Sequence, residues 1–174
     1  MAEPRRVADR RGWCLEDAVP GSVLRHPHGR TIGPAEHVWL AWITNNVSDV
    51  HGNADRAASG EFGGVVVLGA LTVAIVAGLA EPAPFPAAEA SRGLPAGWSS
   101  IALRAAVRPG DTISAASEFL GNEPGDDASG GLVHRRIIGS SQRGETLVVI
   151  EERRFVPSLA TLNKGLLTTG SATA

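Results

Sequence analysis

Residues 63–80 read GGVVVLGALTVAIVAGLA, a run of eighteen residues without a charged side chain. A run of this length lies at the lower limit for a membrane-spanning helix. It contains four glycines, and no Lys/Arg cluster or Trp/Tyr belt flanks it closely. It divides into a valine-rich approach, Gly63–Leu68, and a helix-length piece, Gly69–Leu79. We therefore predict a buried central helix over Gly69–Leu79 rather than a membrane span.

The central helix and the segments that follow it predict the fold class. Thr72 is the one polar side chain of the helix, which is otherwise hydrophobic all round, so we expect it to be buried on all sides. The later part of the chain has strand-like segments separated by turn residues. These predict four strands joined as antiparallel hairpins, and hence an α+β fold with a curved antiparallel sheet wrapped around the central helix. The predicted strands are Ser100–Val107, Thr112–Leu120, Leu132–Ser140 and Thr146–Val156.

A second helix is predicted upstream of the apolar run. It begins at Gly33-Pro34-Ala35-Glu36, because Pro suits the first helical position and Glu the first turn. Val38, Trp39 and Trp42 recur at helical spacing, so we expect them to face the core. The helix stops near Asn45-Asn46.

The domain limits follow from composition. We expect one domain over residues 13–156, preceded by a flexible polar lead over 1–12 and followed by an irregular tail over 157–174. The lead has no apolar signal segment. Val23–Arg30 is predicted as a short strand or extended arm, and the Pro- and Ala-rich segment Glu81–Gly97 as a long irregular connection.

Composition and missing motifs exclude several functions. Hydrophobic residues make up 43% of the 174 residues, enough for a core, and the net charge of −2 offers no basic excess for a nucleic acid. The single cysteine, Cys14, excludes an internal disulfide and a multi-cysteine zinc site. The chain has no P-loop, G-x-S-x-G, G-x-G-x-x-G, H-E-x-x-H or C-x-x-C motif. His26 and His28 have no third ligand nearby, so we expect exposed arm residues, no metal and no cofactor.

The segment Asn45–Asn53 is the candidate reaction site. Turn formation alone explains Asn, Ser and Asp in a polar loop. The loop also carries His51, however, and histidine is the side chain best matched to proton transfer near neutral pH. His37 and His134 are predicted to be structural or exposed.

The stretch GRTIGPAEHVWLAWITNNVSDVHGNADRAA (29–58), followed by GVVVLGALTVAIVAGL (64–79), resembles the MaoC-like hydratases. These are the (R)-specific enoyl-CoA hydratases and related dehydratases of the hot-dog fold. VRPGDTI (107–113) resembles the turn that follows in the family. The resemblance extends over residues 15–156, and it rests on the order and spacing of the motifs.

The resemblance implies roles for particular residues. The family's histidine falls on His51, and the glycine whose N–H binds the thioester oxygen falls on Gly69. The family's aspartate falls on Asn46, and a supporting serine falls on Ala77 and is missing. An asparagine amide cannot accept a proton. The resemblance therefore implies a one-base mechanism in which His51 is the acid–base and Asn46 orients the water or hydroxyl, with Asp49 as a partial substitute for the carboxylate.

The implied reaction adds or removes water at the 2,3-position of an enoyl or 3-hydroxyacyl thioester, carried by coenzyme A or an acyl carrier protein. The resemblance also implies a homodimer with the site near its interface, and we expect a cytoplasmic protein. Arginines of the strand half are candidates to bind the carrier's phosphates. They are Arg104, Arg108, Arg135 and Arg136. The candidate lining of the acyl slot is Trp39, Leu40, Trp42 and Val65–Leu71, from which Leu68 is selected, together with Thr72.

Two other functions stay open. A hot-dog thioesterase generally needs a carboxylate near the carbonyl, and Asp49 and Asp55 match such a motif poorly. A non-catalytic protein that binds an acyl thioester or another small ligand is the other alternative, and it is favoured by Asn46 and Ala77.

Overall fold

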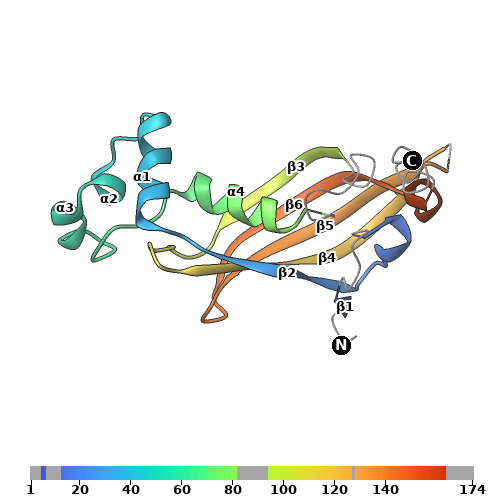
Figure 1. Ribbon diagram of the computed structural model, residues 1–174, viewed down its shortest axis with the longest axis horizontal. Coiled ribbons are helices and arrows are strands. Elements are labelled where there is room, and N and C mark those ends of the chain that lie inside the picture. The colour runs from blue at the N-terminus through green and yellow to red at the C-terminus, as the bar shows by residue number, and fades with distance from the viewer. Residues whose placement is uncertain (1–4, 7–12, 82–93, 127, 164–174) are drawn as a thin grey trace, which may run out of the picture.

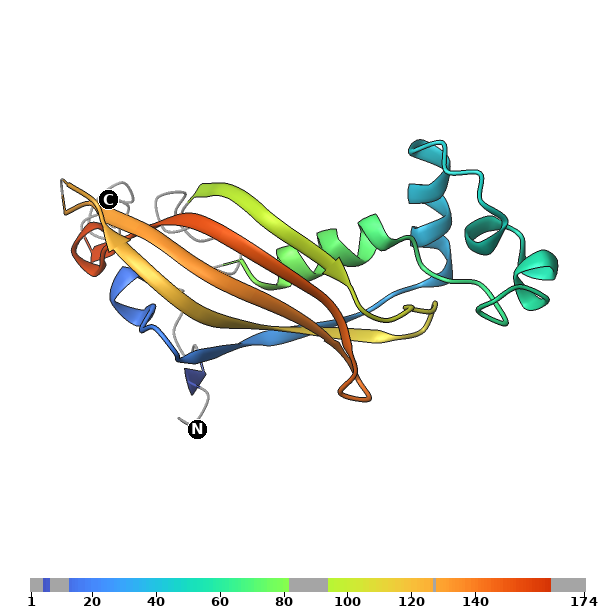
Figure 2. The same cartoon turned by 180° about the vertical axis from the view of Figure 1, so that it is seen from behind.

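A six-stranded curved sheet forms the larger part of the computed structural model, which describes residues 5–6, 13–81, 94–126 and 128–163. The helix α4 lies along one face of the sheet, and α1, α2 and α3 form a lobe beyond one end of it (Figure 1). The view from behind shows the strands curving past α4 (Figure 2). The strands are β1 Arg5–Arg6, β2 Val23–Thr31, β3 Leu94–Leu103, β4 Thr112–Pro124, β5 Gly130–Ser141 and β6 Thr146–Pro157. The helices are η1 Leu15–Asp17, α1 Pro34–Ile43, α2 Asp49–Gly52, α3 Ala54–Ala58 and α4 Gly69–Leu79.

The strand order is β1-β2-β4-β5-β6-β3. All pairings are antiparallel except that of β1 with β2, so the predicted α+β hot-dog architecture is confirmed. The predicted hairpin between the first two strands is wrong, because β3 pairs with β6 and not with β4. The Arg108–Asp111 turn does form, but the chain before it crosses the end of the sheet, where the Arg104 N–H bonds to the Leu147 carbonyl. β3 also begins at Leu94, earlier than expected.

The helix α4 has the predicted bounds and forms the centre of the core. Ile75 and Val76 are buried in one cluster with aliphatic side chains of β4, β5 and β6. A Cβ at Gly139 on β5 would collide with Val76, so glycine there allows α4 to approach the sheet closely. The helix is not buried on all sides as predicted. The sheet covers one side of it, and Ala70, Ala74 and Gly78 are exposed.

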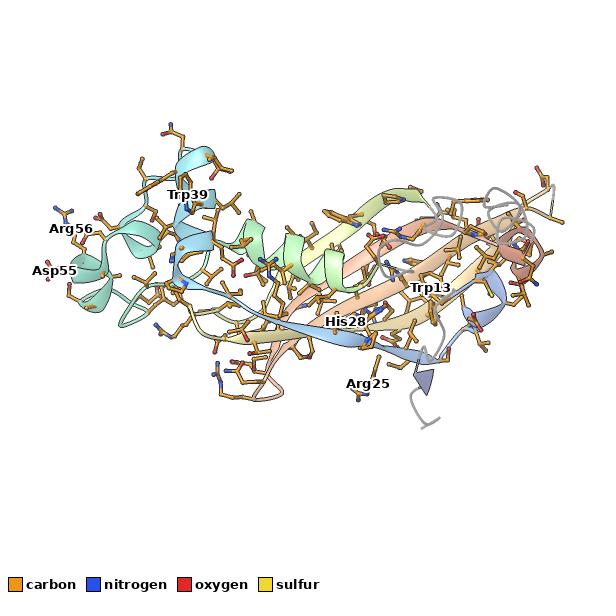
Figure 3. All side chains as sticks on the ribbon, viewed as in Figure 1. Trp13, Arg25, His28, Trp39, Asp55 and Arg56 are labelled. Atoms are coloured by element: carbon orange, nitrogen blue, oxygen red, sulfur yellow. The ribbon has the colours of Figure 1, made fainter. Side chains whose placement is uncertain are left out.

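The orientation of α1 also differs from the prediction. Trp39 is 62% exposed and Trp42 is 68% exposed, and their rings contact each other edge to face with centroids 5.8 Å apart. The buried residues of α1 are His37 and Ala41. Trp39 lies on the outside of the lobe, with Asp55 and Arg56 on α3 (Figure 3). Every residue from 38 to 43 is apolar, so the spacing of hydrophobic residues did not define one buried face.

A buried ionic network lies beneath the C-terminal end of α4. Arg135 on β5 is fully buried, and it donates to the Glu152 carboxylate (2.8 Å) and to the Ala80 carbonyl (2.8 Å). Arg154 also donates to Glu152 (3.1 Å). This placement suits the negative end of a helix dipole, because cations stabilise helix C-termini.

His26 extends this network and is not the exposed arm residue that we predicted. It is 8% exposed, and its Nε2 lies 2.9 Å from the hydroxyl of Ser117. Ser117 also accepts a hydrogen bond from Arg135 (3.1 Å). Burial, reinforced by the charge of Arg135, lowers the pKa of His26 to about 3. His28 is exposed on β2 (Figure 3).

The ends of the chain and the long connection are only partly described. Residues 159–163 are helical rather than irregular, because the Ser158 hydroxyl accepts from the Thr161 N–H (3.3 Å) as a helix cap and Leu162 is buried. Most of the predicted lead and of the predicted connection lie outside the described residues. No helix within the described part of the chain is long and apolar enough to span a membrane.

Candidate functional site

His51 lies in the C-terminal part of α2, and Val66 forms one hydrogen bond with its ring and one with the preceding residue, Val50. The His51 Nδ1 lies 2.7 Å from the Val66 carbonyl, and the Val66 N–H donates to the Val50 carbonyl (3.1 Å). A carbonyl only accepts, so the neutral ring carries its proton on Nδ1. The lone pair of Nε2 is thereby left to act as a base.

Gly69 begins α4 three residues after Val66. At most about 11 Å of chain separates these two residues, so the ring of His51 is tied to the approach of this helix. The first N–H groups of a helix have no partner within it and lie at the positive end of the dipole. A Cβ at Gly69 would lie 2.6 Å from Leu103 Cδ1. Packing against β3 is therefore a second reason for glycine at this position.

Asn46 forms a local turn through its side chain. Its Oδ1 accepts from the Ser48 N–H (3.1 Å), and its own N–H donates to the Ala41 carbonyl (2.8 Å). Because the oxygen is used within the turn, the amide nitrogen of the side chain remains as a donor. Asn46 can thus hold an oxygen atom of a ligand, but it cannot remove a proton.

Asp49 is engaged away from His51. Its carboxylate pairs with the Arg56 guanidinium (3.0 Å) and accepts more weakly from the Asn53 amide (3.5 Å). The Asn53 oxygen in turn caps α3 by accepting from the Arg56 N–H (3.2 Å). This exposed ion pair accounts for Asp49, so the geometry gives no support to Asp49 as the substitute for the missing family carboxylate.

A hollow of about 250 Å³ separates α1 from the polar loop. It is lined by three of the predicted residues, Trp42, Asn46 and Asp49, whereas Leu68 and Thr72 are buried beneath the start of α4. Trp42, Asn46 and Asp49 are thus brought together at the hollow, whereas His51 and Gly69 do not line it. The full lining is Val38, Ala41, Trp42, Asn46, Val47, Ser48, Asp49, Gly52 and Asn53.

His37, for which the sequence left a structural and an exposed position open, is buried in the lobe. It is 2% exposed. Burial lowers its pKa, the charge of His51 lowers it further, and Glu36 opposes both effects. The charge of His51 thus acts on a second histidine of the lobe. The spacing of His37 and Ala41, four residues apart, was the available signal for this face of α1.

The arginines that were candidates for phosphate binding have different surroundings. Arg135 is buried in the ionic network, so the prediction for it is wrong. Arg136 bridges Glu118 and Glu151 on the sheet surface. Among the described residues, no three His, Cys, Asp or Glu side chains gather closely enough to bind a metal ion.

Comparison with known proteins identifies the family. A family model described as MaoC like domain matches residues 16–138. A MaoC-like dehydratase from Rhodospirillum rubrum is similar, with a TM-score of 0.71 and 22% identity over 84% of this chain and 98% of that chain. An unliganded R-hydratase from Pseudomonas aeruginosa has a TM-score of 0.63 and 20% identity over 84% of this chain and 87% of that chain. A chain of the ChsH1–ChsH2 complex from Mycobacterium tuberculosis has a TM-score of 0.59 and 19% identity over 79% of this chain and 98% of that chain.

No curated protein sequence gives a significant match. At these identities the solved structures establish the fold, while the family model extends over most of the chain. The central helix, the polar loop before it and the strands β2, β3 and β4 lie within the matched residues, which end inside β5. The chain belongs to the MaoC-like domain family.

Proposed function

We propose that the chain is a hydratase or dehydratase of enoyl or 3-hydroxyacyl thioesters, with His51 as its acid–base. The observation that carries the proposal is the His51–Val66 hydrogen bond, which leaves Nε2 as the acceptor and ties the ring to the segment that leads into Gly69. Family membership and the R-hydratase among the similar structures support it.

The proposed reaction needs one base. In dehydration, His51 Nε2 removes the proton from C2, the C3–O bond breaks, and the departing hydroxide receives a proton from the same imidazolium and leaves as water. Hydration is the reverse. The Gly69 N–H donates to the thioester oxygen, where negative charge develops. Asn46 donates its amide hydrogen to the oxygen that leaves or enters.

The thioester carrier and the assembly are part of the proposal. β3 is an edge strand of the sheet and carries the exposed side chains Trp98, Ile101 and Leu103. We propose that a second copy covers this edge, since exposed edge strands are sites of pairing. The Leu103 side chain packs against Gly69, so such an interface would border the proposed site. Coenzyme A or an acyl carrier protein in the cytoplasm would supply the substrate.

The test uses a panel of short 2-enoyl-CoA substrates and follows the absorbance of the conjugated thioester. The wild type should hydrate at least one of them, and His51→Asn should lower kcat by about 10²–10⁴-fold because it removes the acid–base. Asn46→Asp restores the family's carboxylate and should retain or raise activity.

The alternatives give different results. Release of free thiol would indicate a thioesterase. Tight binding of an acyl-CoA without turnover, unchanged in His51→Asn, would indicate a binding protein, which the non-basic Asn46 favours. Light scattering after gel filtration should give twice the 18.0 kDa of one chain. A particle with the mass of one chain would refute the homodimer. One similar structure is described as a complex of two differently named components. In that case the next experiment would look for a different partner chain.

A further inference from the structure

His37 is the titratable group of the lobe that the proposed reaction does not use. It lies on α1, and its side chain is 2% exposed. Its Nδ1 is buried, and no described residue forms a hydrogen bond with it. A buried polar atom without a partner destabilises the folded state, so native proteins usually satisfy it with a water or a ligand.

The surroundings of His37 point towards the candidate base. α1 packs against α2, which carries His51, and the charge of His51 acts on His37. Ala41, one turn along the same face of α1, accepts the Asn46 N–H (2.8 Å). The other charged group that acts on His37 is Glu36 on α1, whose carboxylate accepts from the Gly33 N–H (2.7 Å) and pairs with Arg30.

We propose that His37 is a second imidazole of the reaction site, which binds the reacting water or 3-hydroxyl oxygen beside His51. This inference rests on the proposed hydratase function. A neutral imidazole has one N–H donor and one acceptor, so His37 orients the oxygen while His51 alone transfers the proton. With Asn46 in place of a carboxylate, the oxygen would otherwise lack an accepting partner from the protein apart from His51.

The test compares His37→Phe, which keeps a ring of similar size without nitrogen, with His37→Asn, whose amide lies near the former Nδ1. His28→Asn, an exposed histidine on β2, is the matched control. In steady-state hydration, His37→Phe should lower kcat about 10²-fold, since misplacing a reactant by about 1 Å has an effect of this size. KM should change less than about threefold. His37→Asn should recover part of kcat, and His28→Asn should match the wild type.

A folded His37→Phe protein with wild-type kcat would overturn the proposal. If that variant does not fold, the titration described next decides. A second measurement does not need turnover. In NMR titrations, replacing His51 by Asn should raise the pKa of His37, because one cause of its lowering is removed. An unchanged midpoint would show that the rings lie apart. If the wild type hydrates none of the 2-enoyl-CoA substrates, the proposed function itself is refuted.

Discussion

The sheet and the helical lobe differ in how they are held together. In the sheet half, aliphatic side chains of β4, β5 and β6 pack on α4, and buried arginines are paired with Glu152. In the lobe, Ile43 is 74% exposed and Val47 is 87% exposed, and the polar loop is held by backbone bonds and by His51. Segments with few buried apolar contacts open at lower free energy. The sheet half should therefore dominate the stability, while the lobe carries the chemistry.

Glu152→Gln should give the largest loss of stability. It removes the carboxylate that accepts from Arg135, Arg154 and Trp98. Breaking a buried ion pair costs about 3–5 kcal/mol, because the remaining charge stays buried. Denaturation by urea measures the change. The matched variant in the lobe is Asp49→Asn, whose exposed pair should contribute less than about 1 kcal/mol. Equal losses in the two variants would contradict the comparison.

Gly139→Ala should destabilise the protein by about 1–3 kcal/mol through overpacking. Its Cβ would collide with Val76 and lie 3.0 Å from Val148 Cγ1. Gly52→Ala in α2 is the control, because a Cβ there meets open space and alanine favours a helix. Thermal unfolding measures both. Adding Val76→Ala should offset part of the effect of Gly139→Ala, and strictly additive losses would show that the collision is not its cause.

The buried His26 should make the sheet half sensitive to acid. Its pKa is about 3 in the folded state and 6.5 in the unfolded state. Between these values the unfolded chain binds the additional proton, so stability falls as pH decreases from about 6.5 towards 3, by up to ~1.4 kcal/mol per pH unit. His26→Gln should remove this slope from urea unfolding measured across pH. His28→Gln should keep it, and an identical slope in both variants would refute the assignment.

Trp42→Ser should have the smallest effect on the unfolding of the isolated chain. An exposed side chain away from the core usually contributes within about 0.5 kcal/mol. Urea unfolding at two protein concentrations measures it. A larger loss that appears only at the higher concentration would show that a second chain covers this face of α1.

The sequence predicted the sheet half better than the lobe. The charge-free run gave the bounds of α4, and alternating residues gave β6 almost to the residue, since a period of two or of 3.6 in hydrophobicity is a local property. The partner of β3 was mispredicted, because the local sequence of a strand does not determine which distant strand it pairs with. His26 and Arg135 were expected at the surface, yet each is buried through a partner on another strand.

The candidate site shows the same limit. His51, Asn46 and Gly69 were selected by the family resemblance, and the structure adds the bond to Val66 that fixes the tautomer of His51. The buried face of α1 could not be predicted from the sequence, because apolar residues lie on all sides of this helix. The burial of His37 depends on how α1 meets α2, which is a tertiary property.

The four tryptophans provide a built-in optical reporter. Trp13 lies in the core, with the Arg135 guanidinium 5.2 Å from its ring centre and Phe119 edge to face, and Trp98 is half exposed on β3. A soluble quencher such as acrylamide should therefore dim the Trp39–Trp42 pair first and Trp13 last. Any molecule that binds to α1 would shield that pair from the quencher. Its binding can therefore be followed by the quenching of intrinsic tryptophan fluorescence, without a label.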